Sequence, residues 1–342
     1  MSEQFFFRRL PAEWEPQSAV QLTFPHAGTD WADMLGEVLP CFVEIAETIS
    51  RFESVLIVCQ NAAETAALLR NAAQERLIFL EIPSNDTWAR DHGGITILEN
   101  EAPILLDFQF TGWGLKFPAN FDNLITRKLW ETGLLHGEHR YPGLVLEGGG
   151  IESDGQGTLL TTTECLLSPN RNPNLSQTQI EAQLIDLFGL NRVLWLHHGA
   201  LAGDDTDAHI DTLARFCSPD TIAYVRCSDS EDEHYPTLLA MEQELQAFRT
   251  AAGEPYRLVP LPWPDACHAA DGHRLPATYA NFLIINGAVL VPTYRVVEDA
   301  EALRIIADLF PDRQTIGIDC RALIEQHGSL HCLTMQYPAC VV

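Results

Sequence analysis

A unit of two short apolar runs joined by a turn recurs along the chain, and it constrains the fold more than any other feature. The four clear copies are GITILENEAPILLDF, LVLEGGGIESDGQGTLLTT, TLARFCSPDTIAYV and NFLIINGAVLVPTY, of which the last turns at Asn286-Gly287, a dipeptide typical of β-hairpins. Successive turns lie about 55 to 68 residues apart, a spacing that indicates an array of repeated units. The repeat predicts several hairpins of the same kind.

The two ends of the chain each carry one more strand-like run, AVQLTFP and SLHCLTMQYP, and each alone would be an unpaired edge. Pairing them with one another would close a ring of five units. Amphipathic helices are predicted between the hairpins, one of them with an N-cap at Ser176 and a stop at Gly189. We therefore expect an α/β fold, a pseudo-fivefold five-bladed α/β propeller in which residues 1–342 form a single domain. An ordinary α/β sandwich with coincidental spacing is the alternative.

The formal net charge of −26 excludes one class of partner and favours another. A basic face for phosphates is not expected, so nucleic acid is not a predicted partner, whereas an acidic protein attracts a small cation. No apolar run reaches the ~18 residues of a membrane helix, and the stretch MSEQFFFRRLPAEW lacks the apolar region of a signal peptide. We expect a cytoplasmic protein with no membrane partner.

The nine cysteines are scattered and include no Cys-x-x-Cys pair, which argues against a disulfide framework and a thiolate zinc site. Most should be small buried hydrophobes. Cys332 differs because it lies beside the strand predicted to close the ring. That position would bring it to the centre of the molecule.

Polar residues recur at or just before the first strand of each hairpin, in TWARDHGG, LEGGGIESDG, GDDTDAHIDT, TYANF and SLHC. Equivalent strand ends around an axis would face one pocket, so the following residues should converge there: Asp91, Glu147, His209, Asp211 and Cys332. His209 and Asp211 should point the same way along a strand, whereas His331 should point away from Cys332. His209 is therefore the predicted proton carrier for Cys332.

A thiolate, a histidine and three carboxylates in one pocket favour attack on the carbon of a guanidinium. The carboxylates would grip the planar cation at its edges, and the sulfur would split its hydrolysis into two steps. A metallohydrolase using His209, Asp211 and Asp204 is one alternative, although no further ligand with recognisable spacing is present, so no metal and no cofactor are expected. A catalytically silent binding module is another.

The motifs NDTWARD, TGWGLKF, LEGGGIESDGQGTLLTTTECLLSPNRNP, GDDTDAHID, YANFLIINGAVLVPTY and GSLHC resemble, in the same order, those of the agmatine deiminase family, also called bacterial-type peptidyl-arginine deiminases. The resemblance covers nearly the whole chain and implies the five-bladed α/β propeller of the guanidine-modifying (pentein) superfamily. It implies Cys332 as nucleophile, Asp91 and Asp211 as guanidinium ligands, Glu147 as a substrate contact and His209 as general acid/base. Agmatine would yield N-carbamoylputrescine and ammonia through a covalent thiouronium, a reaction of putrescine synthesis.

The same resemblance implies Trp88 and Trp113 as pocket walls and a homodimer or homotetramer as the assembly. The chain departs from the family pattern at HGSLHC, RDHGG and Glu152, all expected near the entrance of the pocket, where they bear on substrate identity. Glu152 or Asp204 is predicted to bind the amine of agmatine. Free arginine and peptidyl-arginine are the alternative substrates, and an amidinotransferase is the related alternative activity.

Overall fold

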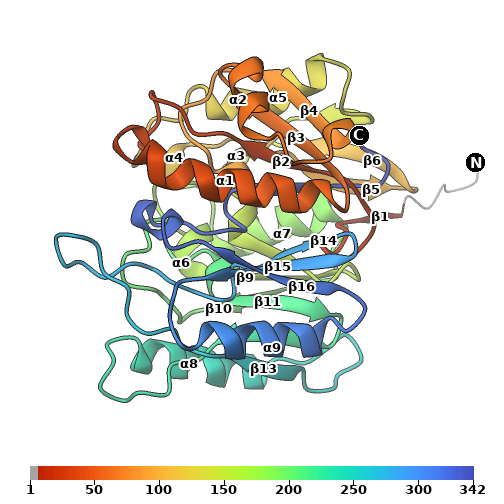
Figure 1. The fold of residues 1–342 in the computed structure, drawn as a ribbon. Helices are drawn as coiled ribbons and strands as arrows, with labels where there is room; N and C mark the ends of the chain where they lie inside the picture. Colours follow the sequence, from red (N-terminus) through yellow and green to blue (C-terminus); the bar gives the residue numbers. More distant parts are fainter. Residues whose placement is uncertain (1–6) are drawn as a thin grey trace, which may run out of the picture.

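The computed structural model describes residues 7–342, and its strands form five separate small sheets with helices between them (Figure 1). In chain order the strands are β1 Arg8–Arg9, β2 Gln17–Thr23, β3 Ser54–Cys59, β4 Leu77–Glu81, β5 Ile95–Glu99, β6 Ala102–Leu106, β7 Glu138–Arg140, β8 Ile151–Ser153, β9 Thr158–Thr162, β10 Arg192–Leu196, β11 Ala214–Ser218, β12 Thr221–Val225, β13 Arg257–Leu261, β14 Leu283–Ile285, β15 Ala288–Thr293, β16 Gln314–Asp319 and β17 Thr334–Pro338. The predicted α/β class is confirmed.

The helices connect strands of the same sheet in most cases. They are α1 Leu35–Ser50, α2 Ala62–Leu68, α3 Ala89–His92, α4 Gly112–Leu115, α5 Ile125–Glu131, α6 Thr163–Leu166, α7 Gln177–Phe188, α8 Tyr235–Ala247 and α9 Asp299–Leu309, with short 3-10 helices η1 Ala32–Met34, η2 Gln74–Arg76, η3 Asp122–Leu124, η4 Gly148–Gly150, η5 Ile210–Thr212 and η6 Leu323–Gln326. Helix α7 begins and ends as predicted, with a capping box between Ser176 and Gln179 and with Gly189 in the left-handed conformation (φ 66°).

The four predicted hairpins are all present as antiparallel pairs, namely β5–β6, β8–β9, β11–β12 and β14–β15. In each case the second strand of the hairpin pairs in parallel with the strand that follows the next long helix along the chain. The two end strands complete the same pattern, because β17 pairs antiparallel with β2 and β2 pairs in parallel with β3. In all five sheets, therefore, one strand has an antiparallel neighbour on one side and a parallel neighbour on the other.

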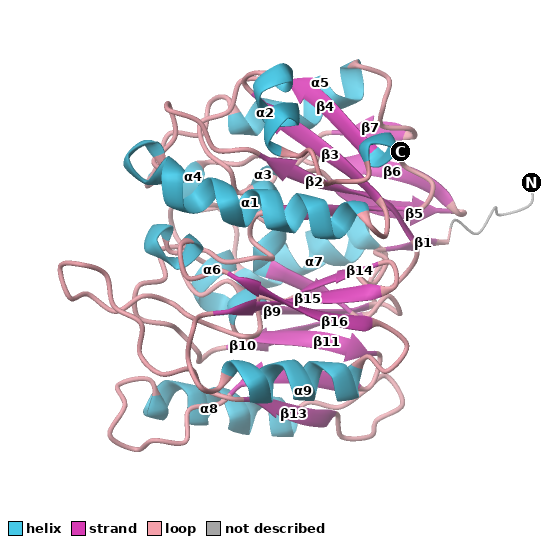
Figure 2. Ribbon diagram, viewed as in Figure 1, coloured by secondary structure: helices cyan, strands magenta, loops and turns pink. Residues whose placement is uncertain are grey.

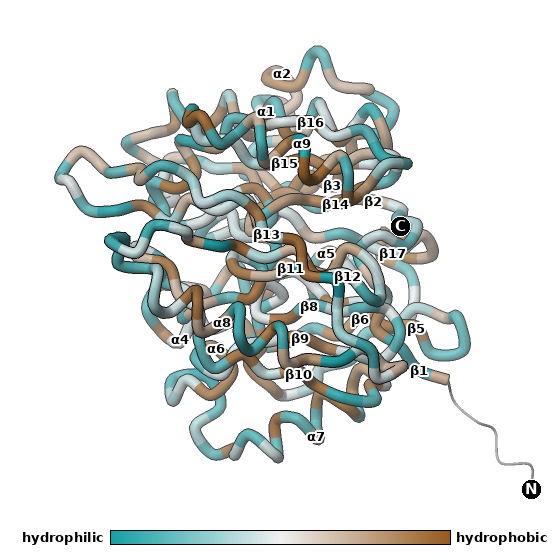
Figure 3. Tube along the Cα trace, turned by 90° about the horizontal axis from the view of Figure 1, so that it is seen from below, coloured by the Kyte–Doolittle hydropathy of each residue, from teal (hydrophilic) through white to brown (hydrophobic). Residues whose placement is uncertain are grey.

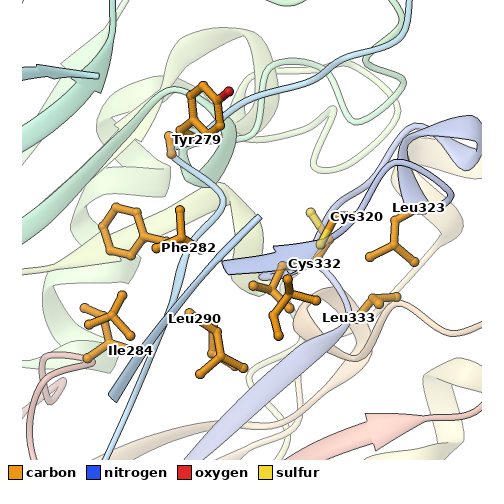
Figure 4. Packing of buried hydrophobic residues seen from close by; sticks show 14 of the residues in the cluster. Tyr279, Phe282, Ile284, Leu290, Cys320, Leu323, Cys332 and Leu333 are labelled. Carbon is orange, nitrogen blue, oxygen red and sulfur yellow. The ribbon is translucent and has the colours of Figure 1, made fainter. Parts of the chain in front are cut away.

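The strands form the interior, and the helices lie outside them. Helix α1 packs against β3 and β16, and α9 packs against β15 and β16; both cross in front of the magenta strands in Figure 2. Apolar residues follow the strands, while the peripheral loops are mostly hydrophilic (Figure 3). Figure 4 shows part of the larger buried cluster, in which Cys332 and Leu333 contribute to the apolar core. Burial of this surface is the main stabilising contribution to the fold.

Two sequence-based expectations concern the membrane and the N-terminus. Within residues 7–342 no helix is both long enough and apolar enough to cross a lipid bilayer. The first part of the stretch used to argue against a signal peptide, residues 1–6, lies outside the described residues.

Candidate active site

The predicted polar residues do converge, although they come from separate sheets. Cys332 Sγ lies 3.7 Å from Asp211 Oδ2, His209 Nδ1 lies 3.6 Å from Asp91 Oδ1, and His209 Nε2 lies 3.9 Å from Glu147 Oε2. All five side chains are at least 95% buried. Each lies in a short segment just before the first strand of a hairpin, which is the position that the repeat predicted.

Gly149 allows this close approach. A Cβ atom at this position would lie 2.6 Å from His209 Nδ1, 2.8 Å from Asp91 Oδ1 and 3.2 Å from Asp211 Oδ2, so any side chain would displace the cluster. The glycine run after Glu147 is therefore required by packing at the site. It leaves the histidine and the two aspartates within reach of a single small ligand.

Several buried polar atoms of the cluster have no hydrogen-bond partner within the described chain. They are Glu147 Oε1, His209 Nδ1, His209 Nε2 and Asp211 Oδ1. Buried polar atoms in folded proteins nearly always have a partner, because an unpartnered one costs about 1–3 kcal/mol. Four such atoms in one buried cluster indicate a site built to receive a polar ligand, and the two carboxylate oxygens among them favour a cation.

The carboxylates are held from behind by fixed donors. Trp113 Nε1 donates to Asp91 Oδ2 at 2.9 Å, and the Gly149 amide donates to Asp91 Oδ1 at 3.0 Å. The buried Arg171 donates through Nε to Glu147 Oε2 at 2.7 Å. Each carboxylate is thereby fixed in position before any ligand binds.

Trp113 reaches Asp91 because its own backbone takes an unusual conformation. Gly112, Trp113, Gly114 and Leu115 all have positive φ, between 54° and 81°. The left-handed region is costly for the two residues that carry a Cβ, and such strain tends to occur at functional sites. Trp113 lines the cavity that contains Cys332, as predicted, and it also orients a carboxylate there, which the sequence did not indicate.

A cavity opens above Cys332. The following residues line it: Asp30, Asp86, Trp88, Asp91, Trp113, Phe117, Asp205, Thr206, Gln326, His327, Gly328 and Cys332. The predicted wall residue Trp88 is among them, and its Nε1 donates to Asp86 Oδ2 at 3.1 Å. Three further aspartates therefore surround the cavity beside the cluster at its base.

The pKa shifts of three groups indicate which of them carry a proton. Burial together with the carboxylates of Asp211 and Asp91 raises the pKa of the Cys332 thiol well above its usual value. Burial alone would lower the pKa of His209, but Asp91, Cys165 and Glu147 raise it well above the usual value. Burial also raises the pKa of Asp91, to about 6. Near neutral pH the unliganded site therefore contains a protonated imidazole and a neutral thiol.

Two predicted amine-binding residues lie elsewhere. Glu152 is buried against Arg215, with 2.8 Å between Glu152 Oε2 and Arg215 Nε, and it does not line the cavity. Asp204 accepts hydrogen bonds from the amides of Thr206 and Ala208 and so closes its own loop. Neither residue lines the cavity above Cys332, because long-range donors hold the carboxylate of Glu152 and local donors hold that of Asp204. The acidic groups that do line the cavity are those of its three further aspartates.

The local geometry of three predicted residues also differs from expectation. His209 directly precedes the 3-10 turn η5, and Asp211 lies within it, so neither residue is in a strand. Their convergence therefore comes from the turn and not from strand alternation. His331, expected to point away from the site, lies 2.8 Å from Asp211 through its Nδ1.

Sequence reasoning missed Asn281, which the fourth hairpin contributes. Its Nδ2 lies 3.2 Å from Cys332 Sγ, and its Oδ1 accepts from the amide of His331 at 2.8 Å. The segment TYANF was singled out by its position in the repeat, but the repeat could not indicate which of its side chains turns inward. Asn281 is fully buried and holds the backbone that presents the thiol.

Within residues 7–342 one group has ligand atoms close enough to share a metal ion. It consists of Glu147, Cys165 and His209, whose atoms all lie within 4.8 Å of one another. Arg171 already binds Glu147 and would repel a divalent cation there. These residues therefore fit a metal poorly, and the predicted ligand Asp204 is not among them.

Comparisons with known proteins agree with the site. The model of the Porphyromonas-type peptidyl-arginine deiminase family matches residues 9–338. The agmatine deiminase of Stutzerimonas stutzeri is 33% identical over 353 residues, which cover 96% of this chain and 95% of the relative. A site with a buried thiol, a histidine and paired carboxylates is typical of enzymes that modify guanidines. The chain belongs to the Porphyromonas-type peptidyl-arginine deiminase family.

Two solved structures resemble this one closely. A Porphyromonas gingivalis protein crystallised as a candidate arginine deiminase is 57% identical, with a TM-score of 0.94 and coverage of 98% of this chain and 99% of that one. A cysteine-to-serine variant of C. jejuni agmatine deiminase with substrate bound is 37% identical, with a TM-score of 0.92 and coverage of 98% of both chains. The folds of these proteins are thus the same along nearly the whole chain.

Proposed function

We propose that this protein hydrolytically deiminates agmatine to N-carbamoylputrescine and ammonia. The observation that carries the proposal is the pair of unpartnered buried carboxylate oxygens in the cluster, Glu147 Oε1 and Asp211 Oδ1, because a guanidinium group offers planar N–H donors and a positive charge to such acceptors. Asp91 and Asp211 are the proposed ligands of the guanidinium nitrogens, and Glu147 is a further contact. The agmatine deiminases of several bacteria are relatives of this chain, which supports the same choice.

The reaction proceeds in two stages. As substrate binds, the Cys332 thiol loses its proton to solvent, and the resulting thiolate adds to the guanidinium carbon. The bond from that carbon to a terminal nitrogen breaks as the protonated His209 donates its proton to the departing ammonia. A positively charged thiouronium remains on the sulfur. His209, now neutral, takes a proton from water as the water adds to the same carbon. The carbon–sulfur bond then breaks, and the ureido product leaves.

The charges of the unliganded site suit a thiol that ionises only with substrate present. The two carboxylates that hold the pKa of Cys332 high are those that a bound guanidinium would neutralise. The same cation would stabilise the thiolate directly. His209, with its raised pKa, begins the cycle as an acid, which matches its first task of protonating ammonia. Deprotonation of the thiol and binding of the substrate are therefore coupled.

The cavity favours a substrate whose far end is cationic. Asp30, Asp86 and Asp205 line it, while no lysine or arginine does so among the residues that the structure describes. An amine at the end of an alkyl chain would be attracted to these aspartates, whereas the carboxylate of free arginine would be repelled. Trp88 and Trp113 provide flat apolar surface for the chain between the two ends.

The first prediction concerns substrate preference. In assays of agmatine, free arginine and a peptide with C-terminal arginine, kcat/KM for agmatine should exceed that for arginine by about 100-fold, since placing like charges together costs several kcal/mol. The measurement is formation of ureido product without added metal. Release of ammonia in proportion to product, unchanged by an added primary amine, distinguishes hydrolysis from amidino transfer. Absence of ureido product from all three compounds would rule out the proposed activity and leave a binding module.

The second prediction concerns pH. Burial raises the pKa of Asp91 to about 6, and the charged groups that face it are His209, Asp211 and Glu147. A guanidinium needs Asp91 ionised, and protonation below that pKa removes the charge. Thus kcat/KM should fall about tenfold per pH unit below pH 6, while the acid limb of kcat lies at lower pH because bound substrate keeps Asp91 charged. A kcat/KM that stays level down to pH 5, with circular dichroism unchanged, would contradict this.

We further propose that the five sheets are the blades of a pseudo-fivefold propeller, closed by the pairing of β17 with β2. The shared strand pattern of the sheets supports this arrangement, as does the convergence of five equivalent segments on one buried cluster. In this arrangement residues 1–342 form one catalytic domain. The pocket at its axis would receive one polar segment from each blade.

A further inference from the structure

A chain of buried charged groups continues behind the candidate active site, on the side away from the cavity. His331 lies between two carboxylates, with Nδ1 2.8 Å from Asp211 Oδ2 and Nε2 2.7 Å from Glu13 Oε1. His331 is 1% exposed, so water does not compete for either contact. These contacts run from Glu13 through His331 to Asp211, whose Oδ2 lies 3.7 Å from Cys332 Sγ, and we call this series of residues the relay.

Both oxygens of Glu13 are held. Oε1 also lies 3.2 Å from Arg90 Nη1, while Oε2 accepts from Arg215 Nη2 at 2.5 Å and from Gln336 Nε2 at 3.0 Å. Burial opposes ionisation of Glu13, but Arg215, His331 and Arg90 lower its pKa well below the usual value. A carboxylate held by Arg90, Arg215 and Gln336 thus faces the imidazole and orients its ring.

The orientation of Asp211 depends on that ring. Asp211 Oδ2 is bound by His331 from behind, whereas Asp211 Oδ1 has no partner in the described chain and is free to meet a ligand. Within residues 7–342 the other side-chain donor near the Asp211 carboxylate is the Cys332 thiol, whose sulfur lies 3.7 Å from Oδ2. Without His331, or with its ring turned, Asp211 would lose the contact that directs its free oxygen toward the substrate.

We propose that Glu13 and His331 are positioning residues that act through Asp211 to set the geometry of the reacting thiol and guanidinium. This inference rests on the proposed function for its kinetic consequences, but the geometry of the relay does not. Glu13 also lines a second cavity that shares no lining residue with the one above Cys332. Glu13 therefore connects the candidate active site with a second cavity of the molecule.

The chain offers a matched control. Glu152 resembles Glu13 in binding Arg215, with 2.8 Å between Glu152 Oε2 and Arg215 Nε, although its side chain is 2% exposed and that of Glu13 is 19% exposed. Its other oxygen accepts from the amide of Phe216 and not from His331. Removing either charge perturbs the same arginine. Of the two glutamates only Glu13 contacts the imidazole, whose ring also contacts Asp211 Oδ2 at 2.8 Å and Arg215 Nη2 at 3.1 Å.

The test compares Glu13→Gln, Glu13→Asp and Glu152→Gln for kcat, KM and thermal unfolding midpoint with agmatine as substrate. Glu13→Asp retains the charge but shortens the side chain by one methylene group, which withdraws the carboxylate from His331 and from Arg215. Both Glu13 variants should lose kcat by about 10- to 100-fold, with KM changed by no more than about threefold, because misplacing a reacting group by about 1 Å has this effect. Glu152→Gln should keep kcat within about twofold at a similar unfolding midpoint.

A second readout separates the relay from the proposed function. Cys340 is the exposed cysteine, so the variants are also made in a Cys340→Ala background and alkylated with iodoacetamide. Freeing Asp211 from its place 3.7 Å from the sulfur should speed alkylation of Cys332 at least about threefold in the Glu13 variants but not in Glu152→Gln. If the rate of alkylation of Cys332 changes equally in all three variants, or in none, Glu13 and His331 do not position Asp211. This outcome is informative even if the wild-type protein deiminates no substrate.

Discussion

Replacing Cys332 with alanine should abolish turnover. In the proposed mechanism the sulfur forms the only covalent bond to substrate, and water attacks a resonance-stabilised guanidinium poorly without it. The expected fall in kcat is at least about 10⁴-fold, comparable to the loss of the nucleophile in other enzymes with covalent intermediates. The measurement is ureido product formed from agmatine at saturating concentration, followed over hours so that a small residual rate is detected.

The fold should survive this change. Cys332 contributes a small side chain to the edge of the apolar cluster, so its truncation costs little compared with a core leucine. Agmatine should still raise the unfolding midpoint of Cys332→Ala, because Asp91, Glu147 and Asp211 are retained. As a control, Cys165→Ala removes a buried cysteine beside His209 without removing the proposed nucleophile. Turnover by Cys332→Ala above about one hundredth of the wild-type kcat would exclude Cys332 as nucleophile.

Replacing Arg215 with methionine should produce the largest loss of stability among single substitutions of charged residues. Arg215 is fully buried and binds both Glu13 and Glu152. It also donates to the carbonyl oxygens of Ala280 and Phe282. Methionine retains the apolar volume but leaves two buried carboxylates without their cation, so the free energy of unfolding should fall by about 3–5 kcal/mol.

The control for this prediction is the replacement of a surface arginine with methionine. Arg304 forms an exposed pair with Asp308 one helical turn along α9, at 3.0 Å. Exposed pairs of this kind contribute about 0–1 kcal/mol, so Arg304→Met should be nearly neutral. Urea or thermal unfolding followed by circular dichroism compares the two. A similar midpoint for both variants would show that the buried network contributes little to stability.

Much of the local structure could be predicted because it depends on neighbouring residues. The turn at Asn286-Gly287 follows from backbone preferences, and the limits of α7 follow from Ser176 and Gly189. The repeat of hairpins then indicated which five segments meet. It could not indicate which side chain of TYANF turns inward, and so Asn281 was missed.

For Glu152 and Asp204, position in the sequence did not predict the contacts that the structure shows. Both lie in motifs close to residues of the candidate site, and sequence proximity suggested that both would meet the substrate. Asp204 instead caps its own loop, which a closer reading of GDDTD as a turn could have anticipated. Glu152 binds Arg215, a residue 63 positions away, and no local pattern indicates that pairing.

The sequence by itself determined the α/β class, the hairpins, the main helices and the five side chains that meet at the candidate site, because these follow from alternation, turn chemistry and the position of each segment in a repeat. The tertiary structure decided which atoms are free to bind and which are already occupied. Hydrogen-bond partners such as Arg215 for Glu152, and His331 for Asp211, come from distant segments and depend on distances of a few ångströms. Such contacts arise only when separate sheets pack together, so the relay behind the site became visible only in the folded chain.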